Sequence, residues 1–366
     1  NGFSLTSSQR KQLLQSPGGA FGSCRFKLPD DIKHPIYKRC IEVFKAHNIR
    51  YFLYNGGGDS QQTSLKIAQA SQYYDHPTHC IGLPKTIDND LPVTDTCPGF
   101  GSTAKYIAVS TQEIALDVVS MHQTSTKVFI FEVMGRHAGW LAAASALGKK
   151  NKQDAPHLIL FPERTFKSED FLHQTASTVR RYGYCIIVTS EGIRDAQGNF
   201  ISDANQTDAF GHTQLGGVAA YLSNLVVSEL KLKTHFAIAD YLQRSARHIA
   251  SKVDLDQAYA VGAKGVELAL NRQSGVMVTI KRLSNANYRW TLTQTPLSRV
   301  AAKERKLPSK FISANGYGIT NSARTYLHPL IQGEAYPQYR HGLPQYLAFQ
   351  PEFVPKKLPD WNDPDV

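Results

Sequence analysis

The chain has 366 residues, of which 42% are hydrophobic and 19% are charged. The hydrophobic share is enough for a sizeable core, and the charged share lies below the usual value of about 25%, which excludes a largely disordered chain. The formal net charge of +11 comes from scattered Lys and Arg residues, and because no basic run is interleaved with aromatic residues we expect small anionic ligands and no nucleic-acid partner.

The five cysteines are odd in number and have no CxxC spacing. This pattern argues against a disulfide framework and a structural zinc site, and it predicts a reducing, cytoplasmic compartment. No apolar run approaches the roughly 20 residues that a membrane helix needs, so we expect no membrane partner.

Apolar runs alternate along the chain with helix-like stretches. Strands are predicted at Arg50–Tyr54, Val128–Val133, His157–Phe161 and Cys185–Thr189, and helices at Ser60–Ser71, Thr103–Ser110 and Trp140–Leu147. Ser284–Thr295 is predicted to be an antiparallel edge, and the Pro- and Tyr-rich tail from Leu327 to pack irregularly on the body.

Strand, glycine-bearing turn and helix in repetition predict an α/β fold with a parallel sheet covered on both faces. In such sheets ligands bind at the carboxyl ends of the strands. The chemistry is therefore expected at Gly56–Ser60, Met134–Arg136 and Ser190–Gly192.

The turn after the first predicted strand contains Gly56, Gly57 and Gly58, followed by Asp59 and Ser60. Glycines let the backbone approach a phosphate, and a helix N-terminus supplies free N–H groups. The same pattern equally fits a tight turn with an Asp or Ser cap. Asp59 would repel an anion unless a cation lay between them.

The segment Pro84–Asp90 combines Lys85 with Asp88 and Asp90. Phosphoryl transfer needs a base, a cation and a divalent metal, and these residue types supply all three. A bare Asp-Asn-Asp run more often caps its own backbone as a loop. The glycine-rich Cys97–Ser102 turn that follows favours the functional interpretation.

Polar residues at later strand ends and turns predict a binding role less strongly. Arg136 fits a phosphate or a sugar hydroxyl as well as a sheet-edge cap, and Glu191 fits a polyol as well as a helix cap. His137 is more often structural than catalytic. In Tyr241–Arg244, Arg244 could bind a sugar phosphate, but a surface Arg on a helix is the more common case.

Taken together, these segments resemble the 6-phosphofructokinase family in order and spacing, along nearly the whole chain. The segments that carry the resemblance are PKTIDNDL with its trailing PGFGS, EVMGRHAGW, FGHTQLGG and YLQR. The resemblance is strongest to the pyrophosphate-using branch. It implies two Rossmann-like lobes with mainly parallel sheets and the active site in the cleft between them. The implied divisions are 1–104 with 243–300 for the phosphoryl donor, 105–242 for the sugar phosphate, and 301–366 as a C-terminal extension.

The resemblance also implies roles for individual residues. Asp88 would take the proton from the 1-hydroxyl of fructose 6-phosphate, and Asp90, with the position of Gly58, would hold Mg²⁺. The implied sugar-phosphate ligands are Thr86, Ile87, Met134, Gly135, Arg136, Glu191, Tyr241, Arg244 and Lys127. The implied donor-phosphate contacts are Arg25, Gly56, Gly57, Ser60, Gly101 and Ser102.

Two residues indicate the donor. Asp59 stands where ATP-using relatives usually have Gly, and its charge and bulk disfavour a nucleotide; Lys85 would neutralise a pyrophosphate leaving group. The resemblance therefore implies reversible transfer from pyrophosphate to fructose 6-phosphate. The alternatives are an ATP-dependent enzyme and a catalytically weak regulatory subunit.

Three departures from the family pattern motivate the second alternative. Gly58 stands where relatives usually have Asp or Asn, and His235 stands near an Arg that many relatives present across a subunit interface. Relatives also begin with a strand and a glycine-rich turn upstream of the segment at Pro17–Gly19, which implies that this sequence is a fragment. As in relatives, we expect a homo-oligomer, either a dimer or a tetramer.

Overall fold

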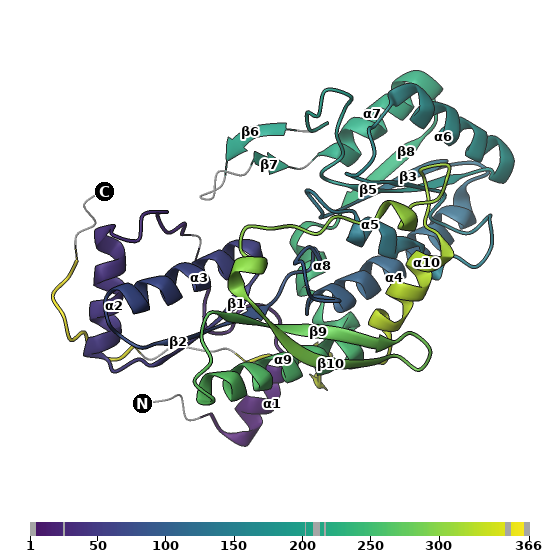
Figure 1. Ribbon diagram of the computed structural model, residues 1–366. Helices are drawn as coiled ribbons and strands as arrows, with labels where there is room; N and C mark the ends of the chain where they lie inside the picture. Colours follow the sequence, from purple (N-terminus) through teal and green to yellow (C-terminus); the bar gives the residue numbers. More distant parts are fainter. Residues whose placement is uncertain are drawn as a thin grey trace.

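Two four-stranded sheets with helices packed against them make up most of the computed structural model (Figure 1). The structure describes residues 5–24, 26–201, 203–207, 213–215, 217–347 and 353–361, and of 203–207 and 213–215 it describes the backbone alone. Figure 1 shows the two sheets side by side, each with its own helices, and α1, the first helix of the chain, lies on the side of the first sheet.

The first sheet contains β1 (Tyr51–Gly56), β2 (His79–Pro84), β9 (Val276–Ser284) and β10 (Arg289–Pro296), in that order. The first three strands are parallel, whereas β9 and β10 form an antiparallel hairpin. α3 (Gly58–Tyr73) packs against β1 and β2, and α9 (Lys252–Leu270) packs against β2 and β9. α2 (Pro35–Ala46) covers α3, and α1 (Ser7–Gln15) lies near the amino end.

The second sheet is fully parallel, with the order β4 (Leu158–Leu160), β5 (Cys185–Ser190), β3 (Val128–Val133) and β8 (Thr234–Ile238). Val128 and Ile130 pack toward α6 (Ser168–Tyr182) and α7 (Val218–Leu230), while Phe131 and Val133 join Trp140 in the core on the other face. That face is covered by α4 (Phe100–Met121) and α5 (Trp140–Ala144). The central strand is therefore buried on both faces, as its continuous apolar run predicts.

The remaining elements are short. They are α8 (Asp240–Ser245), α10 (Asn321–Leu327), the hairpins β6 (Asp203–Thr207) with β7 (Thr213–Leu215) and β11 (Tyr339–Arg340) with β12 (Leu343–Pro344), and the 3₁₀ turns η1 (Ser145–Gly148), η2 (Arg247–Ile249), η3 (Leu297–Arg299), η4 (Ser309–Phe311) and η5 (His328–Ile331). Near the end of the chain, Trp361 packs against the core beneath α2.

The predicted α/β class with two mainly parallel sheets is confirmed. The strand predicted at Val128–Val133 has the observed bounds, and the other three predicted strands differ from β1, β4 and β5 by two residues or fewer at either end. β2 and β8 are not among the predicted strands, and the edge predicted at Ser284–Thr295 is one arm of the longer β9–β10 hairpin. The division into three sequence ranges stays a prediction.

Candidate active site

The segment that follows β2 is held by Thr86. The Thr86 hydroxyl accepts a hydrogen bond from the Asp88 backbone N–H at 3.1 Å and donates to Asp88 Oδ2 at 3.2 Å. The Thr86 backbone N–H donates to the carbonyl oxygen of Pro98 at 3.3 Å. Thr86 is buried, so this local turn fixes the direction of the Asp88 carboxylate.

Asn89 anchors the same segment from within. Its side chain is fully buried and its backbone is left-handed, with φ of 53°. Asn89 Oδ1 accepts from the Cys97 N–H at 3.1 Å, and Nδ2 donates to the Tyr326 hydroxyl at 3.0 Å. These bonds close the loop between Asn89 and Cys97. Asp88 and Asp90 therefore stand on either side of Asn89, whose side chain is fixed.

Arg305 was not expected at this site, and it holds the segment from outside. Its guanidinium donates to the Asn89 carbonyl at 2.8 Å and to the carbonyls of Thr94 and Asp95 at 2.8 and 3.0 Å. It also lies 4.8 Å from the centre of the Trp140 ring, and the Trp140 indole N–H donates to the Arg305 carbonyl at 3.1 Å. Nothing in the sequence around Arg305 signals this role, because its partners are far away in the chain.

The carboxyl ends of β3 and β5 bring Arg136 and Glu191 together. Val133 pairs with Ser190 in the parallel register, and Glu191 accepts a 3.3 Å hydrogen bond from the Gly135 N–H. A Cβ at Gly192 would lie 1.9 Å from the Arg136 carbonyl oxygen, so only glycine permits this approach. The residues Met134–Arg136 and Glu191 thus share one strand-end surface, as predicted.

The charges of these segments act on one another. Burial raises the pKa of Asp88, while the Thr86 hydroxyl and the positive charges of Lys85 and Arg136 lower it. Burial, followed by the negative charge of Asp88, raises the pKa of Glu191 to about 7. Asp88 therefore lies within the electrostatic reach of groups from both sheets, and the predicted base, cations and sugar-side carboxylate converge.

Asp90 faces a second carboxylate that the sequence did not single out. Burial raises the pKa of Asp90 to about 7, and the charges of Asp88 and Glu304 add to that shift. Glu304 also accepts a 2.9 Å bond from His137, which ties the end of β3 to the segment after η3. Asp90 Oδ1 and Arg136 Nε are buried in this cluster and have no hydrogen-bond partner among the residues that the structure describes.

The glycine-rich turn after β1 lies next to Lys85. Gly56 pairs with Pro84, and the Lys85 N–H donates to the Gly56 carbonyl at 3.2 Å. A Cβ at Gly56 would lie 2.0 Å from the Ser60 hydroxyl, so the turn needs glycine there. Gly57 caps α3 without a side-chain hydrogen bond, and Asp59 is exposed in the first turn of that helix.

Gly58 has room for a larger side chain. The nearest atom to a Cβ built at Gly58 is the Lys303 carbonyl oxygen, at 3.8 Å, which is an ordinary contact distance. The missing carboxylate at this position therefore does not reflect a steric requirement.

Gly101 and Ser102 are engaged by another part of the chain. The carboxylate of Asp254 on α9 accepts from the Gly99 N–H at 2.9 Å, the Ser102 N–H at 3.0 Å and the Ser102 hydroxyl at 2.6 Å. A Cβ at Gly101 would lie 2.4 Å from the Leu330 carbonyl oxygen. Because a carboxylate and a main-chain carbonyl already occupy this helix start, we leave both residues out of the proposed donor site.

Lys127 lies away from the other predicted ligands of this chain. It precedes β3, so it is at the opposite end of that strand from Met134, and its ammonium donates to the carbonyls of His122 and Gln123, the latter at 3.1 Å. The strand therefore separates Lys127 from the other predicted sugar-phosphate ligands of the same chain, and its role as a ligand stays a prediction.

Tyr241 and Arg244 lie on α8, beyond the carboxyl end of β8. The Arg244 guanidinium is 3.8 Å from the centre of the Tyr241 ring, and both side chains are exposed. Gln243 Oε1 accepts from the Met134 N–H at 3.3 Å, which fixes α8 beside the end of β3. Arg25 lies outside the described residues, as does half of the FGHTQLGG segment.

Among the residues that the structure describes, no group of three or more His, Cys, Asp or Glu side chains is arranged to hold a metal ion. The unpartnered Asp90 oxygen nevertheless fits Mg²⁺, which proteins bind through one or two carboxylates together with substrate phosphates and water.

A sequence model of the phosphofructokinase family matches residues 1–269. The chain belongs to this family. It is 54% identical over 353 residues to a pyrophosphate–fructose 6-phosphate 1-phosphotransferase of Xanthomonas campestris pv. campestris (strain B100), covering 96% of this chain and 84% of the relative. A protein of the same description from Methylococcus capsulatus is 53% identical over 347 residues, covering 94% of this chain and 83% of the relative.

Solved structures agree with this assignment. The pyrophosphate-dependent phosphofructokinase of Nitrosospira multiformis superposes with a TM-score of 0.89 at 49% identity, covering 98% of this chain and 85% of the other. That of Marinobacter aquaeolei superposes with a TM-score of 0.86 at 50% identity, covering 97% and 84%. The predicted family membership and fold are therefore confirmed.

Proposed function

We propose that this phosphofructokinase family member transfers a phosphoryl group reversibly from pyrophosphate to the 1-hydroxyl of fructose 6-phosphate in glycolysis. The observation that carries the proposal is the position of Asp88. Asp88 lies within the electrostatic reach of Arg136 and Glu191 on the sugar side and of Lys85 on the donor side. The names of the relatives support the same donor and acceptor.

In the forward reaction, the Asp88 carboxylate accepts the proton of the 1-hydroxyl. The sugar oxygen then forms a bond to the terminal phosphorus of pyrophosphate, and the bond from that phosphorus to the bridging oxygen breaks, releasing inorganic phosphate. Lys85 neutralises charge on the departing phosphate. Arg136, Glu191, Tyr241 and Arg244 would bind and orient the sugar phosphate.

Mg²⁺ would offset the negative charge of pyrophosphate when bound. We propose that Asp90 holds it through the unpartnered oxygen, together with phosphate oxygens and water. Gly58 contributes no side chain to that site, so the chain would depend on Asp90 more heavily than a protein with a carboxylate at that position.

The donor is proposed to be pyrophosphate because Asp59 and Lys85 flank the Gly56–Gly58 turn. The test compares fructose 1,6-bisphosphate formation with pyrophosphate and with ATP at equal Mg²⁺. We expect turnover with pyrophosphate and at least a 100-fold lower kcat/KM with ATP, about 2.8 kcal/mol of discrimination. Turnover with ATP but not with pyrophosphate would overturn the proposal that pyrophosphate is the donor. A folded protein that is inactive with both donors would support the regulatory alternative.

We further propose a homo-oligomer in the cytoplasm. β8 is an edge strand with Phe236 and Ile238 45% and 42% exposed, and Lys127 lies at the amino end of the neighbouring strand β3. A second copy packed on this edge would cover the apolar side chains. All five cysteines are free, as expected in a reducing compartment. Light scattering coupled to gel filtration would test the assembly, and a monomer at micromolar concentration would contradict it.

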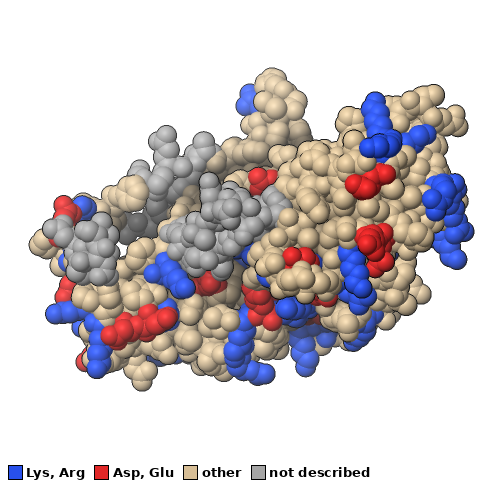
Figure 2. All heavy atoms as spheres, turned by 90° about the horizontal axis from the view of Figure 1, so that it is seen from above, with Lys and Arg blue, Asp and Glu red and all other residues tan. Residues whose placement is uncertain are grey.

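None of the helices in the described part of the chain is long and apolar enough to cross a membrane. On the face shown in Figure 2, the Lys and Arg side chains of described residues are dispersed among Asp and Glu and form no continuous basic patch there. We propose that the basic residues in the site bind small anionic substrates and not nucleic acid.

A further inference from the structure

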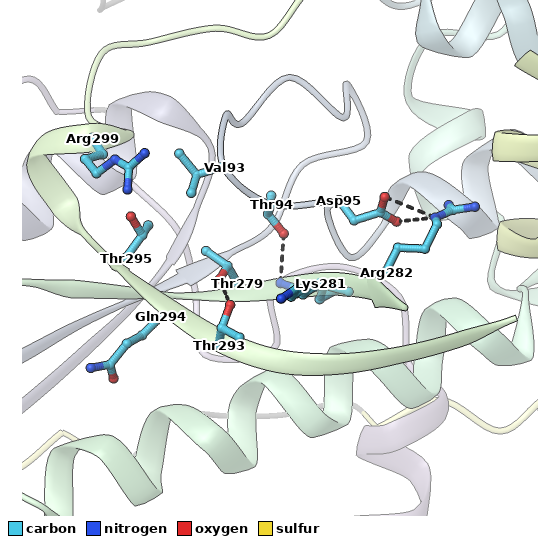
Figure 3. Close-up of a pocket in the computed structure, with 11 residues that line it drawn as sticks. Val93, Thr94, Asp95, Thr279, Lys281, Arg282, Thr293, Gln294, Thr295 and Arg299 are labelled. Carbon is cyan, nitrogen blue, oxygen red and sulfur yellow. Dashed lines mark hydrogen bonds and ion pairs between the residues drawn. The ribbon is translucent and has the colours of Figure 1, made fainter. Parts of the chain in front are cut away.

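A second pocket lies on the first sheet, away from the strand ends that carry Arg136 and Glu191. It has a volume of about 400 Å³ and opens between the β9–β10 hairpin, Arg299 at the end of η3 and the segment Val93–Asp95 (Figure 3). This volume lies in the range of small-molecule sites. None of the predicted site residues lines it.

The walls of the pocket are polar and carry uncompensated positive charge. Asp95 is neutralised by Arg282, whose Nε lies 3.0 Å from its carboxylate. Lys281 and Arg299 also line the pocket, and among the described residues neither has an ion-pair partner. A guanidinium and an ammonium in one pocket are the usual donors to a phosphate group.

Hydroxyl groups complete the lining. Thr279 and Thr293 pair across the hairpin, with their hydroxyls 2.7 Å apart. Thr295, on the same face of β10, is only 3% exposed, and no group in the described part of the chain forms a hydrogen bond with its hydroxyl. In Figure 3 this hydroxyl lies on the side of Thr295 that faces Arg299. An oxygen-rich ligand would provide the acceptor that Thr295 lacks, whereas an apolar ligand would not.

The wall opposite the hairpin is connected to the catalytic segment. The Asp95 N–H donates to the Ile280 carbonyl at 2.8 Å, and the Thr94 hydroxyl accepts from the Ile280 N–H at 3.0 Å. Val93, next to them, is a β-branched residue with φ of 70°, a conformation that stores backbone strain. Arg305 bonds to the carbonyls of Thr94 and Asp95 as well as to Asn89, so one side chain grips both the pocket wall and the loop of Asp88.

We propose that this pocket is a regulatory site that binds the phosphate group of a small phosphorylated metabolite. Occupancy draws Lys281 and Arg299 onto the ligand, shifts the Val93–Asp95 wall, and changes the position of the catalytic segment through Arg305. The binding step stands on the pocket alone, whereas the regulatory step rests on the proposed function.

The binding step is tested by calorimetric titration of the intact protein with glycerol 3-phosphate and, separately, with inorganic phosphate. Arg299→Glu and Lys281→Glu are the test variants, and Arg289→Glu, an exposed cation on β10 outside the pocket, is the matched control. We expect the dissociation constant to rise at least tenfold in both test variants and to stay within twofold in the control. Thermal melting checks that each variant is folded.

The two probes separate the sources of the phosphate group. A preference for glycerol 3-phosphate that weakens in Thr279→Val would show that the hydroxyl lining recognises the metabolite, and equal binding of both probes would identify free phosphate as the ligand. Binding that is unchanged in both charge-reversed variants, or absent for both probes, would overturn the site.

The regulatory step is tested by the rate of pyrophosphate-dependent turnover at saturating substrates. We expect glycerol 3-phosphate to change kcat at least twofold in the wild-type protein and in Arg289→Glu, and to have no effect in Arg299→Glu. Normal turnover with no response in the wild type would overturn regulation alone. An absence of all turnover, with binding intact, would instead refute the proposed function and leave the pocket as a phosphate-binding site.

Discussion

The backbone N–H of Arg305 donates a 2.5 Å hydrogen bond to the carbonyl oxygen of Asp90, and so couples the segment after η3 to the catalytic segment after β2. The Arg305 guanidinium grips the preceding residue, Asn89, at the same time. The carboxylates proposed to accept the proton and to hold Mg²⁺ therefore depend on a residue that touches neither substrate in the proposed mechanism.

Replacing Arg305 by Lys should lower kcat and stability together. Lysine keeps the charge but cannot bridge three main-chain carbonyls with a planar fork. We expect kcat to fall by about tenfold to 100-fold and the free energy of unfolding to fall by about 1–3 kcal/mol, the cost of unmet buried hydrogen bonds. Steady-state kinetics and urea unfolding measure both. The exposed neighbour Lys306→Ala is the control, and a normal kcat in Arg305→Lys would show that the clamp is dispensable.

Asp88→Asn should abolish most of the turnover while leaving the fold intact. Asparagine preserves the shape and can accept the Thr86 hydrogen bond, but it cannot accept the proton of the sugar hydroxyl. We expect kcat to fall by about 10²- to 10⁴-fold, the usual contribution of general-base catalysis, with an unchanged melting temperature. A loss of less than tenfold would assign the base to another group.

Gly58→Asp should strengthen the response to Mg²⁺. The position is open to a side chain and starts α3, where a carboxylate is favoured by the helix dipole. An added carboxylate at this position, which the resemblance assigns to Mg²⁺, should lower the Mg²⁺ concentration for half-maximal rate by about tenfold, since affinity rises with ligand charge. Gly58→Ala controls for bulk, and an equal effect of Ala and Asp would rule out a ligand role.

Asp254→Ala should destabilise the protein far more than Asp256→Ala on the same helix. Asp254 is buried, with burial raising its pKa, and it accepts three hydrogen bonds at the start of α4. Asp256 is exposed and pairs only with Lys252, four residues earlier. We expect the free energy of unfolding to fall by about 2–4 kcal/mol in Asp254→Ala and by less than about 0.5 kcal/mol in Asp256→Ala. Equal losses would contradict the capping role.

Glu191 should make the protein less stable as pH rises toward neutrality. Its pKa is raised from 4.5 to about 7 in the folded state, so between these values the folded chain holds a proton that the unfolded chain has lost. The free energy of unfolding then decreases with rising pH, by at most about 1.4 kcal/mol per pH unit, and levels off above about pH 7.

Urea unfolding from pH 4.5 to 8 without Mg²⁺ or substrates measures this slope. Glu191→Gln should reduce the slope and leave the share of Asp90, whose pKa is also raised to about 7, whereas the exposed Glu113→Gln on α4 should leave the slope unchanged. An identical slope in Glu191→Gln and the wild type would show that this carboxyl does not bind the extra proton.

The strands buried on both faces were the most predictable part of the fold. β3 and β5 each begin with four apolar residues, VFIF and CIIV, which mark them as buried strands, whereas β8 is an exposed edge and its THFAI sequence has no such signal. On the site, the turn chemistry of Thr86 and the strand ends of Arg136 and Glu191 follow from local patterns and the parallel register.

Arg305, Glu304 and Asp254 could not be predicted in the same way. Arg305 meets Asn89 across 216 residues, and Asp254 meets Gly99 across 155. Such contacts are set by how the sheets pack, and no local periodicity encodes them. The contacts of Lys127 with His122 and Gln123, and of Ser102 with Asp254, have the same origin, because only the tertiary arrangement shows which end of a strand or helix is already engaged.

The hydrogen bonds from Arg305 to Asn89 also have a consequence for the order of events during protein synthesis. A ribosome adds about 5–20 residues per second, so the 216 residues between the two partners take on the order of 10–40 s to make. Throughout that interval the nascent chain already contains Asp88 and Asp90 but not the residue that fixes them. Catalytic competence should therefore appear only once Arg305 has been added, after both sheets have emerged.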